Sequence, residues 1–273
     1  MADERPEPDP KQVISGAFSA ASSSYDEVVD FFGPFGRALA TAADLQTGER
    51  VLDVACGRGA SLYPALAAVG DAGSVCGIDL SSGMVERLVT DLRARGASNA
   101  EVRVGDAEAL ELPDGAFDAA LAGFVVFFAP DPPAMLSELH RVVRPGGRVA
   151  LSIFDGPPGF PFMAEVTEEL VGPPSHRPSD EYNKASVLEP ALVRAGFEQP
   201  TGRDVVERFR FADADQVERW LRSHAGRILL DSLDDLQLER FRGLLAERLE
   251  AHRVDGGFEL VQRARVVVAR RPD

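Results

Sequence analysis

The sequence predicts an α/β fold in which a mostly parallel β-sheet is covered by helices. The first indication is a series of short apolar runs separated by helical stretches, because parallel sheets require this alternation. These runs are typical of buried strands and end near Asp53, Asp79, Val104, Gly123 and Phe154. The second is a glycine loop after the first run. The third is size, since 273 residues with 45% hydrophobic content suffice for a substantial core.

The N-terminal region precedes these strands. Residues 1–12 are rich in proline and acidic residues, so we expect a disordered tail. Residues 13–47 carry apolar residues without strand alternation and predict an N-terminal helical cap. Tyr25 of this cap is either a ligand contact or a core residue. For the phenylalanines of the cap, Phe31, Phe32 and Phe35, core packing is the favoured interpretation.

The stretch 51–60 is the centre of the predicted fold. An apolar run there leads into Gly57 and Gly59, which can take positive φ and present backbone N–H groups to a ligand at the start of a helix. A second run ends at Asp79, 22 residues beyond Gly57. An acid at this spacing suits the ribose diol of a bound nucleoside.

Five segments carry a family resemblance. Asp53, Ala55, Gly57 and Gly59 form a D-x-A-x-G-x-G pattern that resembles the first motif of class I S-adenosylmethionine (SAM)-dependent methyltransferases, with alanine at the usual first glycine. Four further segments resemble the later motifs of the family in the same order. They are the strand ending at Asp79, the turn 105–107, the strand 117–124 and the Arg-Pro-Gly-Gly turn 144–147. The resemblance extends over roughly residues 45–155. It implies that the whole chain forms a Rossmann-like, seven-stranded, mostly parallel sheet with an antiparallel last strand, N-terminal helices and a helical lid insertion.

The resemblance also implies which residues hold SAM. Asp79 would take the ribose hydroxyls, Leu80 would pack on the adenine, and the turn 105–107 would hold the adenine edge. The expected cofactor-binding residues are Tyr25, Asp53, Ala55, Cys56, Gly57, Gly59, Asp79, Leu80, Met84, Gly105, Asp106, Ala107, Gly123 and Phe124. No metal site is expected, because the fourth strand ends in Gly123-Phe124 and lacks the carboxylate of magnesium-dependent relatives.

The chain therefore divides into a SAM-binding core, 48–155, and a remainder, 156–273, that completes the sheet. In that remainder residues 213–253 predict a helical insertion, which we interpret as a lid.

Five residues of this insertion share one face at helical spacing: Val217, Trp220, Leu221, His224 and Ile228. His224 is the histidine to test as a catalytic base. The alternatives are a core histidine, or a reaction that needs no base.

The implied chemistry asks little of catalytic side chains. SAM carries its own leaving group, so the protein must chiefly position an acceptor and exclude water. A pocket built from Phe31, Phe32, Phe124, Phe128, Trp220 and the proline loops would suit a small, apolar, aromatic acceptor. We expect a metal-independent methyltransferase resembling the quinone-type and natural-product-tailoring branch, with O- or C-methylation favoured.

Three other functions stay open. An NAD(P)-linked oxidoreductase is disfavoured because Leu62 stands where the third glycine of G-x-G-x-x-G belongs. A SAM-binding protein without methyl transfer keeps the same fold. A pure interaction module leaves the Gly57–Asp79 pattern unexplained.

Composition limits the partners and the compartment. A net charge of −15 argues against nucleic acid or an anionic membrane as a partner, so a small-molecule acceptor is expected. Cys56 and Cys76, interpreted as small buried residues, fit a reducing, cytoplasmic setting. The sequence contains no run of 18 apolar residues, so we expect no membrane-spanning helix. The oligomeric state stays open.

Overall fold

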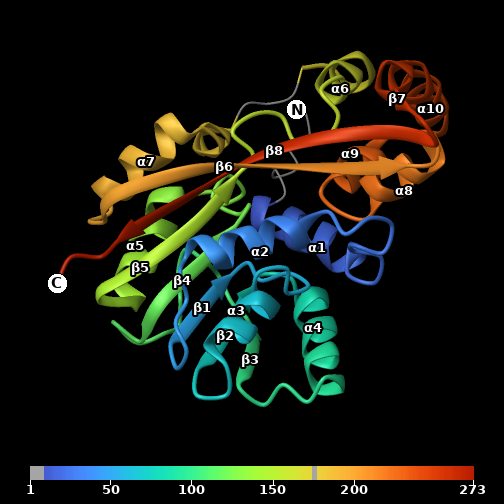
Figure 1. Ribbon diagram of the computed structural model, residues 1–273. Helices are drawn as coiled ribbons and strands as arrows, with labels where there is room; N and C mark the ends of the chain where they lie inside the picture. Colours follow the sequence, from blue (N-terminus) through green and yellow to red (C-terminus); the bar gives the residue numbers. More distant parts are fainter. Residues whose placement is uncertain (1–8, 174–176) are drawn as a thin grey trace, which may run out of the picture.

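The computed structural model describes residues 9–173 and 177–273, which build one mixed sheet between layers of helices (Figure 1). The strands are β1 (Arg50–Val54), β2 (Ser74–Asp79), β3 (Ala100–Val104), β4 (Phe117–Gly123), β5 (Val143–Ile153), β6 (Glu198–Phe211), β7 (Arg253–Val254) and β8 (Gly257–Arg270). Their order is β3-β2-β1-β4-β5-β8-β6, and the two-residue β7 pairs with β8 off this path. The first five in this order are parallel, and β8 is antiparallel to its neighbours. The predicted seven-stranded sheet with an antiparallel last strand is confirmed, with β7 as an addition.

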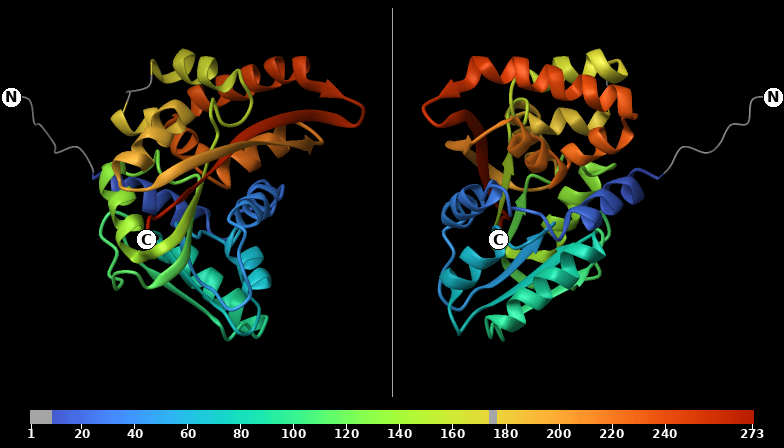
Figure 2. Two further views of the ribbon diagram at one scale, coloured as in Figure 1. Left: turned by 60° about the vertical axis from the view of Figure 1, so that its left-hand side comes forward. Right: turned by 90° about the vertical axis from the view of Figure 1, so that its right-hand side faces the viewer.

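The helices lie on both faces of this sheet. They are α1 (Pro10–Ala21), α2 (Phe32–Ala42), α3 (Leu62–Val69), α4 (Ser82–Ala94), α5 (Pro132–Val142), α6 (Met163–Val171), α7 (Ala185–Arg194), α8 (Ala214–Arg222), α9 (Gly226–Ser232) and α10 (Asp235–Leu249), with 3₁₀ turns at Pro178–Asn183 and Glu250–His252. Helices α2, α3 and α4 cover one face, and α5 and α7 cover the other (Figure 2). Among the described helices, none combines the length and apolar character needed to cross a bilayer.

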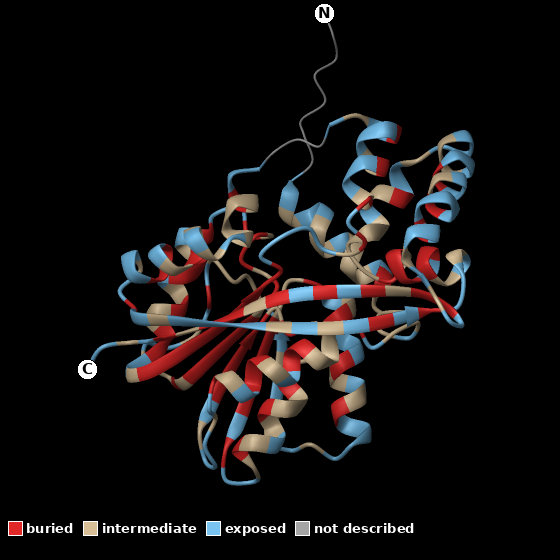
Figure 3. Ribbon diagram, turned by 45° about the horizontal axis from the view of Figure 1, so that its top comes forward, coloured by how far each residue is buried: buried red, intermediate tan, exposed pale blue. Residues whose placement is uncertain are grey.

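The central strands are buried because helices cover both sides of them. Leu52, Leu121 and Leu151, on β1, β4 and β5, have no exposed surface. Such strands are near-continuous apolar runs rather than alternating ones, and Figure 3 shows them as the buried centre of the sheet. This rigid centre fixes the ends of β1, β2 and β4, where the candidate site lies.

The N-terminal helix begins earlier than the sequence analysis predicted. Asp9 caps α1 by accepting a hydrogen bond from the Lys11 backbone N–H at 3.0 Å, and Pro10 occupies the first helical position. Residues 10–12 are therefore helical rather than part of a tail. The rest of the expected tail, apart from Asp9, lies outside the described residues.

The insertion 213–253 contains α8, α9 and α10, at the far end of the long strands β6 and β8 (Figure 1). The prediction that residues from Val217 to Ile228 share one face of a single helix is wrong, because α8 ends at Arg222 and α9 begins at Gly226. A Cβ at Gly226 would lie 2.8 Å from the Leu221 carbonyl oxygen, so this tight turn depends on glycine. His224 lies in the turn, and Ile228 is 38% exposed. The lid role of the insertion stays a proposal.

Candidate functional site

The glycine loop and the end of β2 are joined through Asp79. Its Oδ2 accepts the Gly57 backbone N–H at 2.8 Å, and its Oδ1 accepts the Ser81 backbone N–H at 2.8 Å. Burial raises the pKa of Asp79, and these two hydrogen bonds oppose the rise. A carboxylate offers about four lone-pair positions, so two remain. Because Asp79 also lines a cavity, this unused capacity suits a ligand diol.

The loop itself has left-handed backbone at three positions. Gly57 and Gly59 have φ of 50° and 87°, and Ala55 has φ of 56° although it carries a Cβ. The left-handed region costs about 1–2 kcal/mol for an L-residue. Ala55 therefore carries local strain at the position where the family motif usually has glycine.

We expect Ala55→Gly to stabilise the chain by about 0.5–1 kcal/mol, because the relief of strain exceeds the added freedom of the unfolded chain. Urea unfolding measures this change. The matched control is Ala67→Gly on the exposed face of α3, which should destabilise by about 1 kcal/mol. Equal destabilisation by both substitutions would contradict the account of Ala55.

A cavity of about 400 Å³ opens beside this loop, a volume in the range of small-molecule sites. Thirteen of the predicted site residues line it: Tyr25, Ala55, Cys56, Gly57, Asp79, Leu80, Met84, Gly105, Asp106, Ala107, Gly123, Phe124 and His224. Segments far apart in sequence thus meet at the carboxyl ends of β1, β2 and β4, where open α/β sheets place their ligands.

Asp53 and Gly59 do not line this cavity. Asp53 is completely buried, and both of its carboxylate oxygens accept the Ser61 hydroxyl at 2.9 Å. Burial raises the pKa of Asp53 to about 7. The structure places neither residue in the cavity wall, and their contact with the cofactor stays a prediction. Asp53 instead holds Ser61, which does line the cavity, and Gly59 shapes the turn into α3.

Lys11 is a cavity residue that the sequence analysis missed. Its Nζ lies 2.6 Å from Asp106 Oδ2 and 2.5 Å from Glu108 Oε2. Burial acts to lower the pKa of Lys11, but the hydrogen bonds to these two carboxylates raise it overall. The contact ties α1 to the loop after β3, and the Asp9-Pro10 helix-start signal could have placed Lys11 on a helix.

Aromatic side chains form the other half of the cavity wall. Phe31, Phe32, Phe124, Phe128 and Trp220 all line it, together with Pro158 and Gly159 of a proline loop. The pocket predicted from these residues is therefore assembled in the structure. Phe35 is fully buried and belongs to the core, as interpreted.

Phe124 has an unusual backbone for an aromatic residue. Its φ is 53°, in the left-handed region, and its ring stacks on Phe154 with centroids 4.3 Å apart. Strain of this kind concentrates at functional sites. The conformation fixes the Phe124 ring in the cavity wall just beyond the end of β4.

Some polar atoms of the cavity-lining residues are buried without a hydrogen-bond partner. Within residues 9–173 and 177–273 these are Arg58 Nε on the glycine-loop side, and Ser152 Oγ, Trp220 Nε1 and His224 Nε2 on the side of the aromatic wall. Buried polar groups are normally paired. A bound molecule is therefore a natural source of the missing partners.

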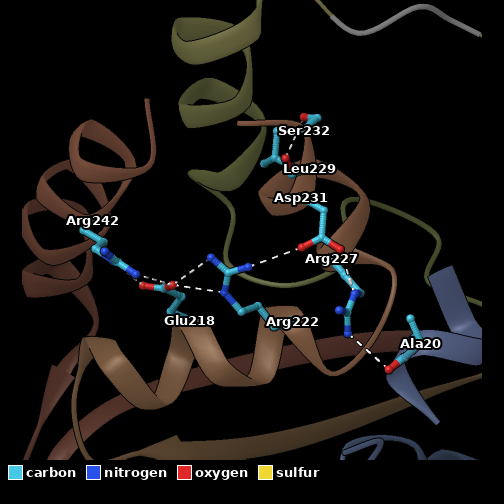
Figure 4. Close-up of polar contacts among 8 residues, drawn as sticks. All are labelled: Ala20, Glu218, Arg222, Arg227, Leu229, Asp231, Ser232 and Arg242. Atoms are coloured by element: carbon cyan, nitrogen blue, oxygen red, sulfur yellow. Dashed lines mark hydrogen bonds and ion pairs between the residues drawn. The ribbon is translucent and has the colours of Figure 1, made fainter. Parts of the chain in front are cut away.

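An ionic chain fixes the insertion against α1 (Figure 4). Glu218 of α8 binds Arg242 of α10 at 2.8 Å and Arg222 at 3.1 Å. Asp231 of α9 binds Arg222 at 3.4 Å and Arg227 at 2.7 Å. Arg227 also donates to the Ala20 carbonyl oxygen of α1 at 3.2 Å. The turn that carries His224 lies between these two arginines.

Comparison with known proteins shows which proteins the chain resembles. Residues 51–147 match the family described as "Methyltransferase domain". The chain is 41% identical to the aklanonic acid methyltransferase of Streptomyces sp. (strain C5) over 143 residues, which cover 52% of the chain and 65% of the relative. It is 38% identical to the nocamycin O-methyltransferase of Saccharothrix syringae over 149 residues, which cover 54% of the chain and 52% of the relative. The matched region thus spans about half to two thirds of these relatives.

The fold is shared with solved structures. A protein from Bacillus halodurans C-125 superposes with a TM-score of 0.58 and 22% identity, over 86% of this chain and 98% of that one. At this identity the likeness shows the fold alone.

Proposed function

The chain belongs to the class I SAM-dependent methyltransferases through its domain at residues 51–147, and we propose that it methylates a small, largely apolar, aromatic acceptor. The observation that carries this proposal is the cavity in which Asp79 and the glycine loop face an aromatic wall. O- or C-methylation without a metal is the form we favour. The cytoplasmic location expected from the composition stays part of this proposal.

The residues present fit the cofactor. Asp79 keeps free lone pairs for the ribose hydroxyls, and left-handed Gly57 leaves the loop without a side chain that could block a ligand. Leu80, Met84 and the turn 105–107 line the same region and would contact the adenine. When bound, SAM supplies an electrophilic methyl group with its own leaving group.

The rest of the chemistry is positioning. The aromatic wall would hold the acceptor and exclude water, and such positioning can supply about 7–11 kcal/mol of the barrier reduction. Lys11 joins α1 to the loop after β3, and Arg227 joins the insertion to α1. In the proposed function, these two segments would act as a lid that keeps the acceptor in place. No general base is assigned among these residues.

Mass spectrometry with trideuteromethyl-labelled SAM tests the proposal. We expect the purified chain to transfer the label to at least one member of a panel of polycyclic phenols, quinones and aromatic carboxylic acids. The Asp79→Ala variant should transfer far less at subsaturating SAM. Tight SAM binding without transfer to any of these acceptors would contradict methyl transfer and support a SAM-binding protein of the same fold.

A further inference from the structure

Two residues of the insertion that line the aromatic half of the cavity, Trp220 and His224, each carry a ring nitrogen without a hydrogen-bond partner among the described residues. Trp220 is 2% exposed, and the indole and imidazole rings of Trp220 and His224 meet edge to face with centroids 4.6 Å apart. Trp220 Nε1 and His224 Nε2 are fully covered and have no partner among the described residues. A buried donor without an acceptor is unfavourable, so an oxygen that pairs with it gains more than it would at the surface.

The hydrogen bonds of His224 determine where its proton lies. The Gly226 backbone N–H donates to Nδ1 at 3.2 Å, which uses the Nδ1 lone pair. In a neutral imidazole the other nitrogen then carries the proton. Burial lowers the pKa of His224 to about 4, so the ring is neutral at pH 7. Nε2 is consequently a donor, and the expected role of His224 as a base is not supported by this arrangement.

The surroundings hold both rings in place. Arg222 and Arg227, on either side of the turn, both bind Asp231, and Arg227 is joined to α1 (Figure 4). Phe31 contacts both rings, with centroids 5.1 Å from Trp220 and 6.2 Å from His224. The donors thus sit in a fixed aromatic frame, and none of the described residues supplies them with an acceptor.

We propose that Trp220 Nε1 and His224 Nε2 form an oxygen-binding subsite, which selects aromatic acceptors that carry a carbonyl or phenolate oxygen. The aromatic body of the acceptor packs on the phenylalanines, and its oxygen accepts from one or both donors. This inference rests on the proposed function, because it assigns the acceptor to this half of the cavity. His224 is then a positioning residue that orients the acceptor rather than removing a proton.

A matched pair of probes tests the subsite directly. 1-Tetralone and tetralin share a ring skeleton and differ in one carbonyl oxygen. Trp220 is the only tryptophan in the chain, so its fluorescence reports binding at the site. We expect the wild-type chain to prefer 1-tetralone. His224→Phe should weaken 1-tetralone binding roughly threefold to tenfold and leave tetralin binding unchanged. His224→Gln keeps a hydrogen-bond donor, so its affinity for 1-tetralone should stay within about twofold of the wild type.

Two further measurements make the test independent of folding and of the proposed function. Long-range proton–nitrogen NMR spectra of the wild-type chain should show His224 as the neutral Nε2–H tautomer, assigned by the signals lost in His224→Gln. His252→Phe, at a histidine that does not line the cavity, should leave both probes unaffected. Equal binding of the two probes by the wild type, or an Nδ1–H or doubly protonated ring, would overturn the subsite. If the wild-type chain prefers 1-tetralone over tetralin but does not bind SAM, only the proposed methyltransferase function is overturned.

Discussion

The Asp79→Ala variant is expected to bind SAM about 1–3 kcal/mol more weakly than the wild-type chain, which is a loss of roughly fivefold to 150-fold in affinity. The carboxylate lies between the glycine loop and α4, accepting one backbone N–H from each side at 2.8 Å. Its removal takes away the acceptor for the ribose hydroxyls and also leaves the Gly57 and Ser81 N–H groups without a partner. Calorimetric titration measures the loss.

Two variants make the Asp79 result specific. Asp71→Ala removes an acid from the exposed turn after α3 and should not change SAM affinity. Asp79→Asn keeps one oxygen acceptor and should fall between alanine and wild type. If Asp79→Ala binds SAM as tightly as the wild type, the ribose assignment is wrong.

Gly36→Ala should destabilise the chain by about 1–3 kcal/mol, because α2 packs directly on the glycine loop. A Cβ at Gly36 would overlap the Ala60 carbonyl oxygen, which belongs to the backbone and cannot rotate away as a flexible side chain can. The helix must shift away from the loop. Since Gly36 also lines the cavity, SAM affinity should fall as well.

The control for Gly36 uses helical glycines in open positions. A Cβ at Gly16 of α1, or at Gly243 of α10, would meet no atom within 4 Å. Alanine there should stabilise the chain by up to about 1 kcal/mol through helix propensity. Thermal or urea unfolding of the three variants compares them. Stabilisation by Gly36→Ala would show that the contact between α2 and the loop is not tight.

Local sequence was sufficient to predict that the glycine loop and Asp79 meet at one cavity. A strand that ends in a glycine loop, and a second strand that ends in an acid, are short-range patterns whose meeting follows from parallel pairing. The structure pairs Val54 of β1 with Ile78 of β2, which brings Gly57 and Asp79 into contact. The motif does not say which of its residues face the cavity, so sequence alone could not place Asp53 behind the loop.

The half of the cavity formed by α1 and the insertion was harder to predict because its contacts are not local. Lys11 and Asp106 are 95 positions apart in the sequence, and no local sequence pattern near either residue predicts their contact. The apolar spacing of α8 continues past Ser223, so periodicity alone extends the helix through His224. The tight turn at Gly226 ends this continuity, and it gives His224 the Gly226 N–H that determines its tautomer.

Side-by-side calorimetric titration of the purified chain with SAM, S-adenosylhomocysteine and NAD⁺ determines whether the cavity binds SAM or a dinucleotide. We expect binding of the first two and none of NAD⁺, because Leu62 replaces the third glycine of the dinucleotide fingerprint and begins α3. Binding of NAD⁺ alone would contradict the cofactor assignment and, with it, the proposed methyl transfer.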